Sequence, residues 1–136
     1  MVVSFRSILD GIIERITHRF PDTEIYCEVD NEGIQQPFFI VKLLKAEQIH
    51  QVHTKYKRVC SFEICYVAED ISAKDKHDIA EQLYELMELI ERNQTLYRGT
   101  EMSHEIIEGV LHFFVKYSFQ IIKEKSAAPK MQNLEQ

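Results

Sequence analysis

One stretch near the end of the chain, residues 110–122, alternates strictly between apolar side chains and others. Its regularly spaced apolar members are Leu111, Phe113, Val115, Tyr117, Phe119 and Ile121. Because successive side chains of a strand point to opposite faces of a sheet, this segment is predicted to be a long strand with one apolar face. Such a face needs a second layer to cover it. The remaining sequence must therefore supply neighbouring strands and that cover.

Further strands are predicted from the same two-residue period at residues 24–29, 37–45, about 57–68 and, more weakly, 96–107. The polar turn at residues 30–33 ends in Gly33, so the first two strands should form a hairpin. The second strand is apolar on both faces, and both faces therefore need cover. Residues 45–56 either continue this strand as a long hairpin arm or form a mobile loop.

Two segments have the period of amphipathic helices. The first runs from an N-cap at Ser4 to about Arg19 and should stop before Pro21. The second begins at Ser72, a predicted N-cap, and continues to about Glu91. The fold class that follows is α+β, with an antiparallel or mixed sheet of about five strands and both helices packed on one face. We expect residues 1–122 to form one domain and residues 123–136 a flexible tail.

Composition limits the possible functions. The chain has 136 residues, of which 45% are hydrophobic, and its formal net charge is −6. This acidic balance disfavours a protein that binds nucleic acid by neutralising phosphates. We expect no membrane span, since no apolar run approaches the ~20 residues required. The N-terminal sequence does not have the pattern of a secretory signal.

The cysteines indicate neither a disulfide scaffold nor a zinc knuckle. There are three, Cys27, Cys60 and Cys65, an odd number without a CxxC pair. We interpret all three as buried free thiols.

Histidines give further candidates for a metal or catalytic site. His50 and His53 have the spacing of a metal pair, but no further ligand accompanies them, and a polar hairpin arm is the better interpretation. His104 and His112 are predicted to face each other across the last hairpin, as a polar pair rather than a general base, because no nucleophile is placed beside them. We therefore expect no metal and no cofactor.

Charged clusters have ordinary explanations. Glu81, Glu85 and Glu88 recur at helical spacing, which is typical of a solvated helix face. The basic segment KYKR, residues 55–58, fits a solvated strand end, with an acidic partner surface or passing DNA as the alternative. No glycine-rich phosphate loop is present.

Several segments together resemble the tail terminator proteins of phages and phage-derived tail elements, especially those with contractile tails. They are the opening helix ending in RFPDTEIYCEVDNEGIQQPFFIV, the strand CSFEICYVAED, the amphipathic helix after it, and the closing MSHEIIEGVLHFFVKYSF. The most telling pieces are the junction FP..IY, the turn leading to PFF, and the hairpin EGVLHFFVKY. The resemblance covers about residues 5–122.

The resemblance implies a structural role without catalysis. Members of this family form a ring, usually a hexamer, on the head-proximal end of the tail tube, where they stop polymerisation and present a joining surface. It implies homo-oligomers, the tail tube protein, and also sheath and neck or head-completion proteins as partners. It implies no membrane partner and no sequence-specific nucleic acid. Such a protein is expected in the host cytoplasm during assembly and then in the virion tail or a phage-like particle.

Under this interpretation the arm from Lys45 to Lys57 contacts the tube, neighbouring subunits or sheath. Apolar residues interrupt its otherwise polar sequence, and the predicted contact residues are Ile49, Val52, His53, Tyr56, Lys57 and Arg58.

Two alternatives remain open. One is another head-tail joining component of the neck, built on a similar plan. The other is a small enzyme or regulatory module whose site is assembled from His104, His112 and Cys65.

Overall fold

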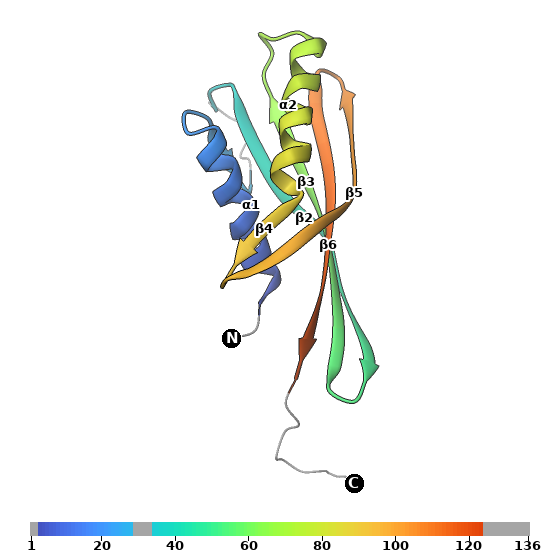
Figure 1. The fold of residues 1–136 in the computed structure, drawn as a ribbon. Helices are drawn as coiled ribbons and strands as arrows, with labels where there is room; N and C mark the ends of the chain where they lie inside the picture. Colours follow the sequence, from blue (N-terminus) through green and yellow to red (C-terminus); the bar gives the residue numbers. More distant parts are fainter. Residues whose placement is uncertain (1–2, 29–33, 124–136) are drawn as a thin grey trace.

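A single mixed sheet with two helices on one face makes up the described part of the chain (Figure 1). The computed structural model describes residues 3–28 and 34–123. Along the chain, the elements are α1 (Phe5–Arg19), β1 (Glu24–Tyr26), β2 (Phe38–Val52), β3 (Lys55–Val67), α2 (Ala73–Met87), β4 (Leu89–Arg92), β5 (Thr95–Ile107) and β6 (Val110–Ile122). The six strands lie in the order β1-β2-β3-β6-β5-β4. The predicted fold class is therefore confirmed, with one strand more than expected.

The core fills the space between the helices and one face of the sheet. The alternating apolar residues of β6 are all buried there, and β3 adds Cys60, Phe62, Ile64 and Tyr66. From the helices come Ile8, Ile12 and Ile16 of α1 and Ala80, Leu83 and Met87 of α2. We call the opposite face of the sheet, which carries Ile40, Glu63, Cys65, His112 and Phe114, the outer face. The strands predicted from alternation therefore have one covered face, as their pattern required.

Both helices begin where the sequence predicts. The backbone N–H of Ser7 donates to Ser4 Oγ at 3.1 Å, and that of Asp75 donates to Ser72 Oγ at 3.2 Å. Each hydroxyl satisfies a donor that the first helical turn leaves without a partner. α1 ends at Arg19, directly before Phe20 and Pro21.

The second helix ends earlier than predicted. It stops at Met87, and the next residues form β4, which pairs antiparallel with the start of β5 through a tight turn. The two turn residues, Asn93 and Gln94, have φ of 51° and 65°, the backbone form that favours two-residue hairpins. Ile90 is fully buried and fits both the helical and the strand period. Its spacing after Met87 therefore led to the wrong prediction that the helix continues.

The first two strands do not form the predicted hairpin. β1 pairs with β2 in parallel, with Glu24 opposite Phe38 and Tyr26 opposite Ile40. Parallel neighbours require the connection to carry the chain back along the sheet before β2 begins. The turn predicted at residues 30–33 lies outside the described residues, as does the predicted tail from residue 124 onward.

Side-chain hydrogen bonds fix α2 at both ends. Near its start, the buried Lys76 donates from Nζ to the carbonyl oxygen of Gly109 at 2.6 Å, in the turn between β5 and β6. At its end, the buried Tyr117 hydroxyl of β6 donates to the carbonyl oxygen of Met87 at 2.7 Å. A helix C-terminus leaves its last carbonyls without intrahelical partners, and Tyr117 supplies one donor.

The cysteine prediction is correct in two cases of three. Cys60 and Cys65 are free and buried, whereas Cys27 is free and exposed. Among the described residues, no helix is long and apolar enough to cross a membrane.

Candidate functional site

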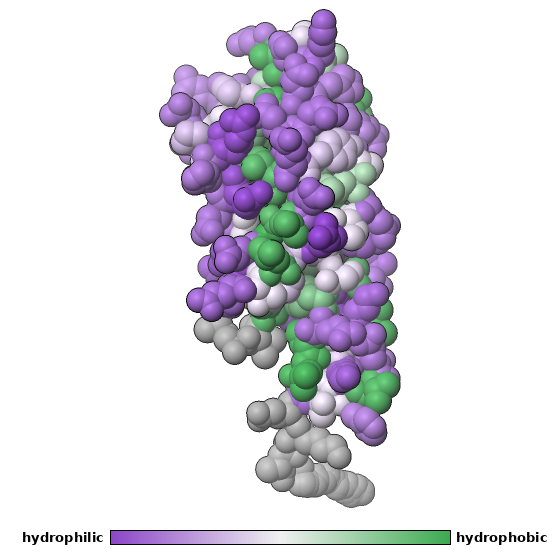
Figure 2. Space-filling view, in the orientation of Figure 1, coloured by the Kyte–Doolittle hydropathy of each residue, from purple (hydrophilic) through white to green (hydrophobic). Residues whose placement is uncertain are grey.

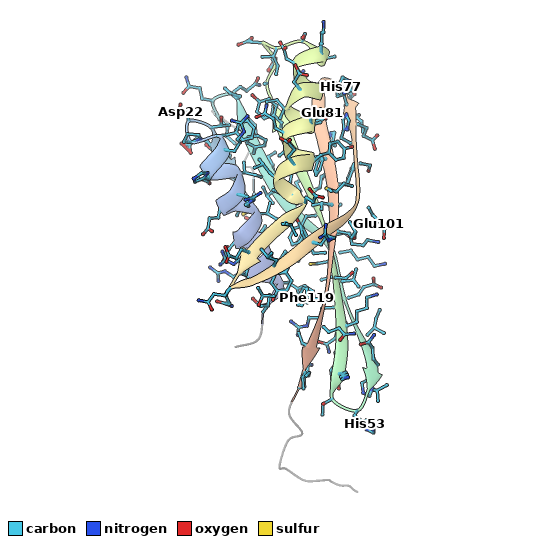
Figure 3. All side chains as sticks on the ribbon, viewed as in Figure 1. Asp22, His53, His77, Glu81, Glu101 and Phe119 are labelled. Atoms are coloured by element: carbon cyan, nitrogen blue, oxygen red, sulfur yellow. The ribbon has the colours of Figure 1, made fainter. Side chains whose placement is uncertain are left out.

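The segment that the sequence left as either arm or loop is an arm. β2 runs on to Val52 and β3 begins at Lys55, so residues 45–57 form a paired hairpin that projects beyond the helices (Figure 1). His53 lies at its tip (Figure 3) and adopts a φ of 52°. The end of β6 pairs along β3, from Ser118 opposite Val59 to Ile122 opposite Lys55. The arm is therefore a three-stranded extension of the sheet.

Exposed apolar residues gather on one side of this arm. In the register, Val52, Lys55 and Ile122 lie side by side, and Ile49 lies beside Lys57 in the next row. These side chains continue the outer face of the sheet. Ile49, Val52 and Ile122 are 47%, 56% and 64% exposed. Figure 2 shows apolar surface at the end of the arm, below the mostly polar surface of the helices.

The side of the arm that faces the helices has a different character. His50 stacks on Tyr56 with ring centroids 4.7 Å apart, and the Lys123 ammonium lies 4.7 Å from the centroid of the Tyr56 ring. Arg58 donates to Gln48 at 2.9 Å.

A second contact holds Arg58 against the first helix. Its guanidinium lies 4.8 Å from the ring centroid of Phe5. The predicted contact residues are therefore split: Ile49, Val52 and Lys57 lie on the outer side, while Tyr56 and Arg58 make intramolecular contacts on the other.

The predicted pairing of His104 with His112 is wrong. His104 lies opposite Phe113, and His112 lies opposite Glu105, so the two imidazoles occupy different faces of the sheet. His104 faces α2. The sequence placed both histidines on the last hairpin but did not determine the register of its two strands. A shift of one residue in that register moves a side chain to the other face of the sheet.

On the helix side, His104 joins a short hydrogen-bonded chain. Its Nδ1 lies 2.8 Å from the hydroxyl of Tyr84, and its Nε2 lies 2.9 Å from His77 Nδ1. With neutral rings, the Tyr84 hydroxyl donates to His104, which in turn donates to His77. Figure 3 shows His77 on α2, one turn before Glu81. These hydrogen bonds connect α2 to β5, and we interpret their role as structural.

His112 instead lies in a polar cluster on the outer face. Its Nδ1 is 2.9 Å from Glu63 Oε2 and 3.3 Å from Cys65 Sγ. Burial, followed by the charge of Glu63, raises the pKa of the Cys65 thiol to about 12. We call Glu63, Cys65 and His112 the outer-face cluster. Sequence alternation places Glu63 and Cys65 on one face, but only the pairing of β3 with β6 brings His112 to them.

The acidic positions of α2 behave as predicted. Glu81 and Glu85 of α2, and Glu88 directly after its last residue, are all exposed, and Glu88 pairs with Arg98 at 3.8 Å. Carboxylates on a solvated helix face, with no shared cavity, are not arranged as an acid and base pair.

Comparison with known proteins agrees with the resemblance seen in the sequence. The model of one family, described as phage tail terminator protein, matches residues 7–129. No curated protein matches the sequence. Thirteen chains of solved structures match, and one of them aligns over 92% of this chain and 99% of its own, with a TM-score of 0.48 and 12% sequence identity.

Proposed function

Because the chain belongs to the phage tail terminator family and is a structural protein of the phage tail, we propose that it forms a ring that caps the head-proximal end of the tail tube. The ring, usually of six subunits in this family, would stop tube polymerisation and provide the surface that the neck or head joins. Tube, sheath and neck proteins are its proposed partners. The observation that carries the proposal is the projecting arm with its exposed apolar side.

The two edges of the sheet support ring closure. β1 pairs only with Phe38–Ile40, so among the described residues no strand pairs with the outer edge of β2 from Lys42 to Val52. At the other edge of the sheet, β4 pairs only with Thr95–Arg98, so β4 leaves the rest of β5 uncovered. A closed ring needs two different, complementary surfaces on each subunit. Two long, dissimilar edges on opposite sides of the sheet are suited to that arrangement.

The arm is suited to a second contact, with the tube or a neighbouring subunit. Aliphatic side chains that are about half exposed gain free energy when a partner covers them. Fully burying an Ile or Val is worth about 1.5–3 kcal/mol, so covering the exposed half of Ile49 and of Val52 is worth about 1 kcal/mol each. Loss of both would weaken each subunit contact about 30-fold.

The enzyme alternative keeps only part of its predicted site in this fold. His104 and His112 point to opposite faces, so they cannot act together on one substrate atom, whereas Cys65 and His112 lie 3.3 Å apart on the outer face. The raised pKa of Cys65, about 12, keeps its thiol protonated near neutral pH, and a protonated thiol is a poor nucleophile.

The test uses self-polymerising tail tube protein from the same genome, imaged by negative-stain electron microscopy with and without this protein. Wild type should give shorter tubes with an extra ring at one end. The double variant Ile49→Ser, Val52→Ser should remain folded, because both side chains are exposed, but should cap far fewer tube ends at the same concentration.

A control replaces an exposed residue of α2, away from the arm and from both sheet edges. Glu85 serves this purpose, and Glu85→Ser should cap like wild type. Normal capping by the double variant would remove the arm from the proposal. Bare, unshortened tubes with folded wild-type protein would reject the terminator role itself and favour a neck component.

A further inference from the structure

Three metal-binding side chains converge on the outer face, away from the arm and from both free edges. The outer-face cluster offers a carboxylate oxygen from Glu63, a sulfur from Cys65 and a ring nitrogen from His112, all within 4.8 Å of one another. Two come from β3 and one from β6, so the cluster spans two strands at the middle of the sheet. The donors are partly or fully buried, and the pairing of β3 with β6 holds the backbones that carry them side by side.

The geometry is close to that of a tetrahedral zinc site. Zn²⁺ binds N and O at about 2.1 Å and S at about 2.3 Å, which places neighbouring donors about 3.4–3.6 Å apart. The Nδ1–Oε2 and Nδ1–Sγ distances, 2.9 and 3.3 Å, need to widen by only a few tenths of an ångström. Rotation of the Glu63 carboxylate provides the remaining adjustment. A donor set of thiolate, imidazole and carboxylate favours zinc over magnesium or calcium.

Binding of a cation would rearrange the protons of the outer-face cluster. His112 Nδ1–H donates to Glu63, and the Cys65 thiol is also close to that carboxylate. On binding Zn²⁺, the thiol would lose its proton to solvent and become a thiolate, and the imidazole proton would move to Nε2 so that Nδ1 can coordinate. The charge of the cluster then changes from −1 to neutral, with a net release of one proton.

Neighbouring charges on the outer face nearly balance. Lys42 lies opposite Glu63 on β2, and its ammonium opposes a cation. Glu105 lies opposite His112 on β5, and its exposed carboxylate favours one.

From this arrangement we propose that Glu63, Cys65 and His112 bind one Zn²⁺ ion, with a water molecule in the fourth position. The ion ties β3 to β6 across the face that the helices leave uncovered. This site would revise the sequence-based expectation of no metal, and it does not depend on the tail-capping proposal.

The experiment titrates the full, tag-free chain, first stripped with a chelator, with Zn²⁺ in competition with a chromophoric chelator. Wild type should bind one Zn²⁺ per chain, at least about 100-fold more tightly than Cys65→Ser. Co²⁺ in place of Zn²⁺ should give a thiolate-to-cobalt charge-transfer band that Cys65→Ser lacks. Zn²⁺ should also raise the unfolding temperature of wild type but not of this variant.

Two variants serve as matched controls. Cys27→Ser removes an exposed thiol, and His104→Gln removes an imidazole on the other face, so both should bind Zn²⁺ like wild type. If Cys65→Ser fails to fold, Glu63→Gln, which keeps the side-chain shape, provides the zinc-affinity and unfolding-temperature tests, while its cobalt complex should keep the thiolate band. Folded wild type without stoichiometric zinc, a cobalt complex without the thiolate band, or undiminished binding by the cluster variants would each overturn the site.

Discussion

The variant Tyr117→Phe removes one oxygen atom from the buried junction of β6 and α2. The Tyr117 ring is fully buried, and its hydroxyl donates to the carbonyl oxygen of Met87 at 2.7 Å. Phenylalanine keeps the edge-on contact with Phe62, whose ring centroid is 6.2 Å away. The variant therefore tests the hydrogen bond almost in isolation.

The expected loss of stability arises because the Met87 carbonyl oxygen stays buried in the variant without the donor that Tyr117 supplies. A buried hydrogen bond contributes about 1 kcal/mol net, and leaving the acceptor without a donor adds about 1–3 kcal/mol. We expect the free energy of unfolding at pH 7 to fall by about 2 kcal/mol. In a urea titration followed by circular dichroism, that is roughly 1 M in the midpoint for a slope of about 2 kcal/mol/M.

The same variant should change the response to alkaline pH. Burial raises the pKa of Tyr117 above its ordinary value of 10.0, so the folded protein keeps this proton after the unfolded chain has released it. The contribution to stability is complete below pH 10 and declines above it, by about 1.4 kcal/mol at pH 11. The phenylalanine variant has no such proton at this position. The stability difference between the two proteins should therefore shrink between pH 9 and pH 11.

Tyr26→Phe provides the control, because no hydrogen bond of the Tyr26 hydroxyl is found among the described residues and the ring is only partly buried. It should change the free energy of unfolding by less than about 0.5 kcal/mol. Equal stability of Tyr117→Phe and wild type at pH 7, or a difference that does not depend on pH, would refute the reasoning.

Three further predictions concern single positions. A Cβ at Gly99 would overlap the carbonyl oxygen of Met87, so Gly99→Ala should lower the free energy of unfolding by about 2 kcal/mol or more in urea, and wild-type stability would contradict this close approach. Ser72→Ala should cost about 1 kcal/mol in the same assay through loss of the α2 cap, and an unchanged midpoint would count against that cap. Iodoacetamide at pH 8 should alkylate Cys27 but not Cys60, since burial raises the pKa of Cys60 to about 11 and leaves about one thiolate in a thousand; mass spectrometry showing equal labelling would rule this out.

The parts of the fold that could be predicted from the sequence are those whose residue pattern is compatible with only one type of secondary structure. The alternation of residues 110–122 fixed both the bounds of β6 and its buried face, since every second residue is apolar over the full length. Ser4 and Ser72 marked both helix starts, because a side chain that caps a helix acts on residues close in sequence.

Sequence was misleading where the deciding contact is distant. Ile90 fits a helix and a strand equally well, and its close packing against Gly11 of α1 decides for the strand. Turn residues before β2 indicated a reversal but not which direction of pairing results. The outer-face cluster was missed for the same reason, because His112 reaches Cys65 only through strand pairing across 47 positions of sequence.

The continuity of the strands has a mechanical consequence for the arm. β3 and β6 pair without a register shift from Lys55 and Ile122 in the arm to Tyr66 and Leu111 above the core. β2 has a register shift against β3 at the base of the arm, between Leu43 and Lys45, whereas the β3–β6 ladder is uninterrupted. Through this ladder the arm is tied directly to the body of the sheet. A force on its tip is shared among many hydrogen bonds and reaches the body of the protein as a change in the twist of the sheet beneath the helices.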